Sequence, residues 1–171
     1  MKQFFLGSMV TVLVLALGGF IYLSFGFAEM RGDISPSHLE SSLMHMAVHA
    51  SVRRHAPEVP NPISPTEENL ISGGKIYLNQ CSGCHGTPGK PQKWADPLNP
   101  APPRLAEIGT EYSEAQIFWV AKHGVRRTGM FANGVWEDDQ KLWTVAAYIY
   151  RIKSLPPLVT EEIDKAAKSG G

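Results

Sequence analysis

Part of the hydrophobic content of this chain is concentrated in one charge-free run near the N-terminus. No residue from Phe4 to Ala28 is charged, and at about 1.5 Å per residue a helix of this length crosses a hydrocarbon layer of roughly 30 Å. A cleavable signal peptide is the alternative, because Gly26 and Ala28 are small residues suited to a cleavage site. The run exceeds the apolar region usual in signal peptides, so we predict an uncleaved transmembrane anchor over residues 1–28.

The charges beside this run predict its orientation. Lys2 precedes it, and Glu29, Arg31 and Asp33 follow it. A cation before the run favours a cytoplasmic N-terminus. We therefore expect a single-pass protein of the cell inner membrane, with lipid around the anchor and the rest of the chain facing the periplasm.

A polar, helix-forming segment and a proline-rich segment come next. Ser35 is suited to an N-cap and Pro36 to the first helical position. Apolar residues then recur at three- and four-residue steps, which predicts a juxtamembrane helix within residues 29–56. These residues are Leu39, Leu43, Met46 and Ala50. Four prolines predict a stiff, extended linker over residues 57–65.

The pattern from residue 66 to residue 158 predicts a domain with three main helices. The first runs from Thr66 into the cysteine motif, the second starts at the capping box Ser113–Gln116, and the third starts near Glu137 and stops before Pro156. No stretch alternates like a strand, so the fold class is all-α. Residues 159–171 are assigned to a C-terminal tail. The predicted inner positions are Leu70, Ile71, Gly74, Tyr77, Leu78, Ile117, Phe118, Val120, Ala121, Leu142, Val145, Ala146 and Ile149.

The charge balance gives no reason to expect nucleic acid as a partner. Lys and Arg together number 16, as do Asp and Glu, so no net positive charge favours nucleic acid.

The stretch from Gly86 to Gly109 is long, irregular and rich in proline. Such loops are unusual in a small domain, and a large bound cofactor would organise them.

The only two cysteines lie in the motif Cys81-Ser-Gly-Cys84-His85. A disulfide would close too short a loop to stabilise much, a structural zinc site needs more ligands than His123 could add, and a redox dithiol belongs to an α/β sheet. Cys-x-x-Cys-His is the c-type haem attachment signature. Both sulfurs can bond the vinyl groups at one porphyrin edge, and His85 can then reach the iron. We predict one covalently attached haem c.

A second iron ligand would have to be His123 or Met130, which are the other histidine and methionine of this domain. His123 ends the second helix beside Gly124, where a cationic side chain often caps a helix. Met130 lies on a glycine-flanked loop that can bring its sulfur to the face opposite His85, so we favour Met130. His/Met ligation closes the iron and raises its reduction potential, which suits electron transfer.

These features occur in an order that resembles class I cytochrome c. Gly74 and Tyr77 precede "CSGCH", and "PPRL", the "TGM" loop and the aromatic helix "LWTVAAYIY" follow. The resemblance covers about Thr66 to Leu155. The family it points to includes subunits or domains of respiratory oxidases and dehydrogenases. It implies a small cytochrome c fold, with three main helices around one covalent haem.

The resemblance also implies roles for individual residues. Cys81 and Cys84 would form the thioethers, and His85 and Met130 would be the axial ligands. Pro102 or Pro103 would lie beside the haem, with a nearby backbone carbonyl accepting the imidazole proton. The family usually has a proline directly after the axial methionine, and here that residue is Phe131.

Further positions follow from the same resemblance. Gly74 would allow close approach of the first and last helices, with Trp143, Ala147 or Tyr148 opposite. Three arginines are candidates for the haem propionates or for a docking surface, and Trp94 for a wall of the pocket. The arginines are Arg104, Arg126 and Arg127.

Four histidines precede the domain: His38, His45, His49 and His55. His45 and His49 are one helical turn apart and could chelate a metal. The alternative is a wet interfacial helix that docks to a partner or to lipid.

The leading function is that of a membrane-tethered electron carrier with no catalytic residues of its own, and therefore not an enzyme. Its expected partners are redox proteins such as a quinol-oxidising complex, a terminal oxidase or a dehydrogenase. The alternative is a permanent haem subunit of such a respiratory complex. A haem-based gas sensor or a peroxidase-like enzyme would need an open iron site, which Met130 ligation would close.

Overall fold

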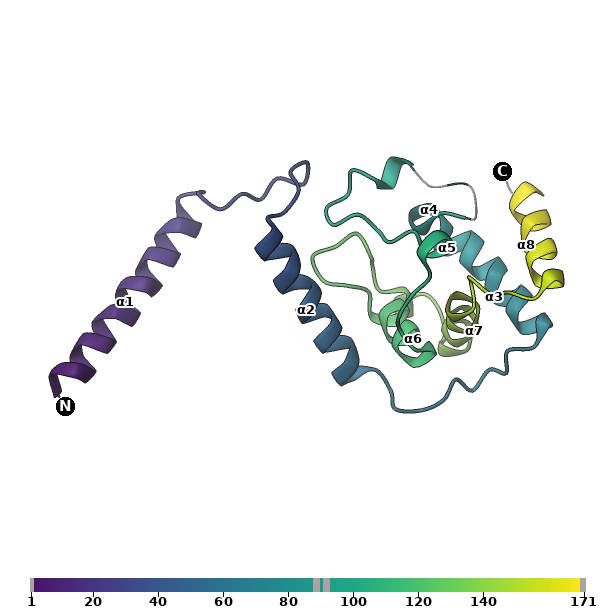
Figure 1. The fold of residues 1–171 in the computed structure, drawn as a ribbon, viewed down its shortest axis with the longest axis horizontal. Helices are drawn as coiled ribbons and strands as arrows, with labels where there is room; N and C mark the ends of the chain where they lie inside the picture. Colours follow the sequence, from purple (N-terminus) through teal and green to yellow (C-terminus); the bar gives the residue numbers. More distant parts are fainter. Residues whose placement is uncertain (1, 88–89, 91–92, 170–171) are drawn as a thin grey trace. The chain divides into compact units, whose positions relative to one another are not determined.

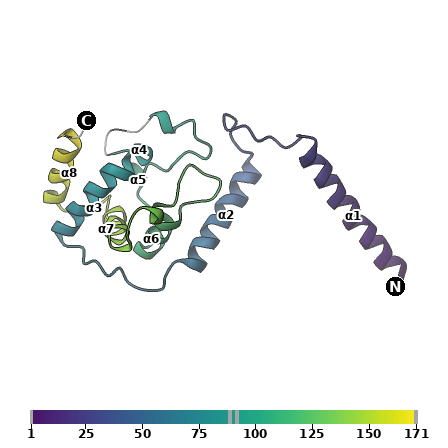
Figure 2. The same cartoon turned by 180° about the vertical axis from the view of Figure 1, so that it is seen from behind.

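The computed structural model describes residues 2–87, 90 and 93–169. Its contacts divide the chain into two compact units, residues 1–34 and residues 35–171. Every regular element in the described ranges is helical, which confirms the all-α prediction (Figures 1 and 2). The α-helices are α1 Lys2–Ser24, α2 His38–His55, α3 Glu67–Gln80, α4 Ser82–His85, α5 Leu105–Ile108, α6 Glu114–His123, α7 Asp139–Tyr150 and α8 Pro157–Ser169; the 3₁₀ turns are η1 Lys93–Ala95 and η2 Asn133–Val135.

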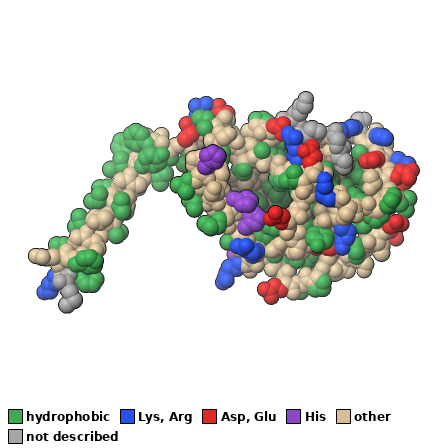
Figure 3. Space-filling model, in the orientation of Figure 1, with side chains coloured by type: hydrophobic (Ala, Val, Ile, Leu, Met, Phe, Trp, Pro, Cys, Tyr) green, Lys and Arg blue, Asp and Glu red, His purple; other side chains and the backbone are tan. Residues whose placement is uncertain are grey.

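Helix α1 forms the first unit. Within the described residues it is the one helix long and apolar enough to cross a membrane, and Figure 3 shows its surface covered mainly by hydrophobic side chains. The helix ends before the apolar run does, since Gly26 adopts a left-handed conformation with φ of 76°.

The N-cap of helix α2 lies two residues later than the predicted cap at Ser35. The hydroxyl of Ser37 accepts a hydrogen bond from the backbone N–H of Glu40 at 3.2 Å. Ser37 is therefore the N-cap, and the prediction that Pro36 opens the helix is wrong.

The three predicted helices of the second unit correspond to α3, α6 and α7. Thr66 and Asp138 cap α3 and α7, and Ser113 and Gln116 form the predicted capping box at α6. Helix α7 packs against both α3 and α6 and is buried from Leu142 to Ile149. The Phe118 ring of α6 stacks on the Trp143 ring of α7 with centroids 4.1 Å apart.

The closest approach of α3 and α7 occurs at Gly73, not at the predicted Gly74. A Cβ atom at Gly73 would lie 2.5 Å from the carbonyl oxygen of Thr144 and 2.9 Å from Cβ of Tyr148. A Cβ atom at Gly74 would instead meet the side chains of Ile163 and Tyr148. The predicted neighbour Tyr148 is therefore present, but the residue that admits the α7 backbone is Gly73.

Residues 157–169 form a helix of the core rather than a tail. Val159 and Ile163 of α8 are buried, and α8 packs against α3. Their spacing of four residues was available in the sequence, but the prolines before them suggested an end to the fold.

Helix α2 and the proline-rich segment belong to the same compact unit as the three main helices. Val52 of α2 is fully buried, with 0% exposure, and α2 contacts α6. The side-chain amide of Asn61 donates to the Trp143 carbonyl at 3.0 Å and to a Glu114 carboxylate oxygen at 2.5 Å. The linker predicted over residues 57–65 is therefore fastened to the domain that follows it.

Candidate functional site

The cysteine motif lies where α3 gives way to the short helix α4. The N–H of Cys81 donates to the Tyr77 carbonyl at 2.9 Å, and the N–H of His85 donates to the Cys81 carbonyl at 2.9 Å. Gly86 ends α4 with a φ of 73°, and the buried Tyr77 hydroxyl donates to its carbonyl at 2.7 Å. The core residue Tyr77 thus holds both ends of the motif in place.

The imidazole of His85 is oriented by the loop that carries Pro103. Nδ1 of His85 lies 2.7 Å from the Pro103 carbonyl oxygen. A carbonyl can only accept a hydrogen bond, so Nδ1 carries the proton and Nε2 keeps a free lone pair. Burial lowers the pKa of His85, and the bond to Pro103 opposes that shift. The ring is therefore suited to act as a neutral ligand through Nε2.

The environment of Cys81 argues against a redox dithiol. Both cysteines are free thiols. Burial, with a smaller contribution from the neighbouring Cys84, raises the pKa of the Cys81 thiol to about 12. Reactive cysteines of dithiol oxidoreductases have a lowered pKa, because the thiolate is the nucleophile.

Hydrogen bonds fix the loop that carries Met130. The N–H of Val125 donates to the Met130 carbonyl at 3.0 Å. The Thr128 hydroxyl donates to the Val125 carbonyl at 2.8 Å and accepts from the N–H of Met130 at 3.1 Å. Gly124 is required beneath the loop, where φ is 66° and a Cβ atom would lie 2.5 Å from the Met130 carbonyl oxygen. The backbone of Met130 is thus held on both sides although Phe131 replaces the usual proline.

Two contacts bring this loop to the other parts of the predicted site. A Cβ atom at Gly129 would lie 3.6 Å from Cδ1 of Leu98, which belongs to the proline-rich loop. Gln80, directly before Cys81, donates to the Glu137 carboxylate at 2.6 Å. The segments containing the cysteine motif, Pro103 and Met130, far apart in the sequence, therefore gather on one side of the helical core (Figures 1 and 2).

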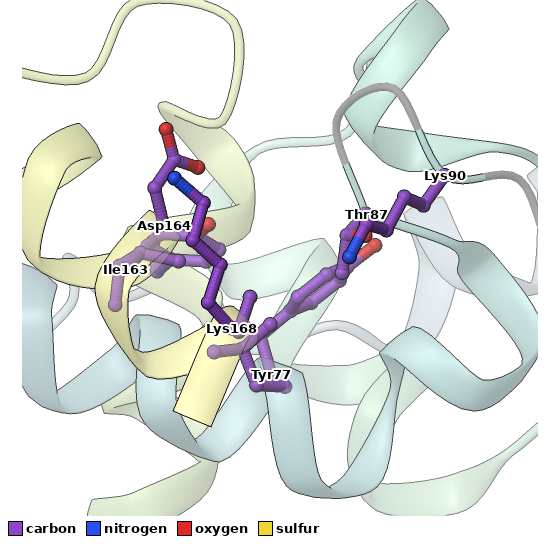
Figure 4. A pocket seen from close by; sticks show the side chains of 9 residues that line it. Tyr77, Thr87, Lys90, Ile163, Asp164 and Lys168 are labelled. Carbon is purple, nitrogen blue, oxygen red and sulfur yellow. The ribbon is translucent and has the colours of Figure 1, made fainter. Parts of the chain in front are cut away.

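A separate cavity of about 200 Å³ lies behind the motif (Figure 4). Tyr77 and Ile163 form part of its apolar wall, while Thr87, Asp164 and Lys168 add polar groups. Neither the two cysteines nor His85 lines it. It is a gap between α3 and α8, not the site that the motif predicts.

The structure places the other predicted site residues on the surface. Arg104 forms an ion pair with Asp96 at 2.9 Å, which raises the pKa of Arg104 and joins two parts of the proline-rich loop. Arg127 is exposed and has a φ of 63°. Trp94 is 58% exposed, so the role of a pocket wall stays a prediction.

The alternative ligand His123 is exposed at the C-terminal end of α6. Its ring lies 5.1 Å from the Trp119 ring, measured between centroids. Sequence reasoning missed Gly73, Thr128 and Gln80, which support the site through the backbone or through a surface contact. A threonine two residues before Met130 was the only sequence signal for any of these contacts.

Comparison with known proteins identifies a family for part of the chain. The sequence pattern of the family described as "Cytochrome C oxidase, cbb3-type, subunit III" matches residues 68–149. The match contains the cysteine motif, Pro103 and Met130. No curated protein and no solved structure matches the chain.

The donor set fits a covalent haem. Two cysteines precede a histidine whose Nδ1 is bonded to a carbonyl and whose Nε2 can meet a metal. The region that matches the family includes all three residues, and Cys-x-x-Cys-His is the c-type haem attachment signature. Residues 68–149 are therefore a monohaem c-type cytochrome domain with covalently bound haem c, in a chain that begins with one apolar helix.

Proposed function

We propose that the protein is a membrane-anchored cytochrome that passes single electrons between redox partners on the periplasmic side of the membrane. Cys81 and Cys84 would hold the haem, and His85 and Met130 would ligate its iron. The observation that carries the proposal is the 2.7 Å contact between Nδ1 of His85 and the Pro103 carbonyl oxygen, since it fixes the tautomer that a haem ligand needs.

Bound haem supplies a one-electron couple. The residues of the chain would keep both ligands in place when the charge of the site changes. His85 is held by Pro103, and the Met130 loop is closed by Val125 and Thr128. Ligands on a fixed backbone favour rapid electron exchange, because little structure has to rearrange. With both axial positions occupied, the protein would act as a carrier rather than as an enzyme.

Arg104 and Arg127 would serve the haem propionates or a docking surface. Both are cationic and lie on the loops that carry Pro103 and Met130. The ion pair with Asp96 already engages Arg104, so Arg127 is the freer of these two candidates to approach a propionate.

The anchor would be α1, with the haem domain attached to it through residues 25–37. The contacts separate the two units after Ile34. Mobility between anchor and haem domain would therefore arise before α2 rather than in the proline-rich segment, which Asn61 fastens to the domain. A tether of this kind keeps the haem at a high effective concentration near membrane partners.

A second candidate is a permanent haem subunit of a larger respiratory complex such as a terminal oxidase. One observation favours it: the match to a family named for an oxidase subunit. Purification in mild detergent separates the candidates. A fixed subunit co-elutes with other chains in constant ratio, whereas a carrier elutes alone.

The test of the proposed site is Met130→Ala in the haem-loaded protein, with Met46→Ala as the matched control. Wild type and Met46→Ala should show the weak near-infrared band of sulfur-to-iron charge transfer in the oxidised state. Met130→Ala should lose this band, bind carbon monoxide when reduced, and have a lower midpoint potential, because a methionine ligand raises the potential. A wild-type protein without the band, or a band retained in Met130→Ala, would overturn Met130 as the ligand.

A further inference from the structure

His45 and His49 form a close pair on α2 that the haem site does not use. Their Nε2 atoms lie 3.1 Å apart, and their ring centroids 4.2 Å apart. The two residues occupy successive turns of one helix face. Figure 3 shows histidines gathered over α2 on the face of the molecule in view.

The fold restricts the orientation of this pair. The ring of His49 is half-buried and packs against the ring of Tyr112, with centroids 5.0 Å apart. Tyr112 precedes α6, so the contact joins two separate elements. Val52, one turn after His49, is fully buried and anchors α2 at this point. The side chains therefore project from a helix held by tertiary packing, which reduces the entropy lost when they bind a ligand.

The separation of the nitrogens matches a chelate. A zinc–imidazole bond is about 2.0–2.1 Å long, so two such bonds span about 2.9 Å at a right angle and about 3.3 Å at the tetrahedral angle. The observed 3.1 Å between the Nε2 atoms of His45 and His49 lies between these values. In the absence of metal one Nε2–H donates to the other Nε2, and a metal ion would replace that proton.

We propose that His45 and His49 form a binding site for a divalent transition-metal ion, with Zn²⁺ as the representative. Neutral imidazole suits zinc, copper and nickel, whereas magnesium and calcium prefer oxygen ligands. In the part of the chain that the structure describes, no group of three His, Cys, Asp or Glu side chains is placed to hold a metal. The protein thus supplies two ligands, and water or a ligand from another molecule completes the coordination. Such a site exchanges its metal readily.

The experiment is a calorimetric titration of Zn²⁺ into the full-length, haem-loaded protein in detergent. Zinc has no redox chemistry, so the oxidation state of the haem stays constant. The variants are His45→Gln and His49→Gln, and the control is His38→Gln, on the same helix and outside the pair. We expect one saturable site, an affinity at least about tenfold lower in each pair variant, and no change in His38→Gln.

Equal zinc binding by wild type and the His45→Gln/His49→Gln double variant would overturn the proposal, as would equal weakening in His38→Gln. A spectroscopic measurement distinguishes loss of an imidazole ligand from a folding defect in the variants. In the oxidised protein, the Cu²⁺ electron paramagnetic resonance spectrum should show coupling to two imidazole nitrogens, and to one in His45→Gln. A spectrum that is identical in both proteins would also reject the site. Neither experiment depends on Met130, so the proposed electron-transfer function is tested separately.

Discussion

Nδ1 of His85 lies 2.7 Å from the carbonyl oxygen of Pro103, eighteen residues later in the chain. The bond holds the proton on Nδ1, so Nε2 is the nitrogen that would face the iron, and the same bond would raise the basicity of that ligand. The sequence predicted that a backbone carbonyl near Pro102 or Pro103 accepts the imidazole N–H, and in the structure that carbonyl is the one of Pro103.

Replacing Pro103 by alanine should raise the midpoint potential of the haem. The substitution frees φ at this residue, which weakens the hydrogen bond to His85 and makes the imidazole a less basic ligand. A less basic ligand stabilises the oxidised iron less. Redox titration should show a shift of up to about 60 mV, the value for a tenfold change in a one-electron couple. Pro102→Ala is the control, and equal shifts in both variants would contradict this role of Pro103.

Thr128→Val should loosen the Met130 loop while preserving its shape. Valine removes two hydrogen bonds, to the Val125 carbonyl and from the Met130 N–H, each with a net contribution of about 1 kcal/mol. Added imidazole should then displace the methionine roughly ten- to thirtyfold more readily, as measured by absorbance titration of the oxidised protein.

Thr160→Val is the control for this prediction, because Thr160 is exposed on α8 and its hydroxyl donates to the Pro156 carbonyl at 3.3 Å. Identical imidazole affinity in wild type and Thr128→Val would show that Thr128 does not hold the ligand loop.

Gly73→Ala should destabilise the domain more than Gly74→Ala. The new methyl group at Gly73 meets the α7 backbone at Thr144, which cannot move without shifting the helix. Overpacking of this kind costs about 1–3 kcal/mol. At Gly74 the methyl group meets the side chains of Ile163 and Tyr148, which can adjust more easily. Thermal denaturation of the haem-loaded variants measures the order, and a larger loss for Gly74→Ala would place the tighter contact at α8.

Asn61→Ala should release the segment between α2 and α3. The substitution leaves the Trp143 carbonyl without its side-chain donor and removes a partner of Glu114, which also pairs with Arg151 at 2.7 Å. We expect a loss of about 1–3 kcal/mol in the free energy of unfolding and faster proteolysis within residues 57–65. Asn79→Ala, at an exposed position of α3, is the control. Unchanged proteolysis in Asn61→Ala would mean that packing of α2 alone holds the segment.

Local sequence signals were sufficient for helices α3, α6 and α7 and for the haem attachment motif. The capping residues Thr66 and Ser113 act through neighbours three residues away, so their role is visible in a short stretch of sequence. The motif from Cys81 to His85 is equally local, because Cys81 caps the short helix α4 and Cys84 and His85 belong to it. The charge-free run from Phe4 onward identified α1 by length and composition alone.

Contacts between distant segments could be decided only by the tertiary structure. Gly73 and Gly74 are adjacent and chemically identical, and only the crossing of α3 and α7 distinguishes them. The face of α8 that carries Val159 and Ile163 is buried because α8 packs against α3. Asn61 anchors its segment because the fold places the carbonyl of Trp143 within hydrogen-bond distance. The sequence by itself determined helices α1, α3, α6 and α7 and the haem attachment motif, since these depend on residues within a few positions of one another. The tertiary structure determined which carbonyl orients His85 and which glycine admits the α7 backbone, because these contacts join segments that lie far apart in the chain.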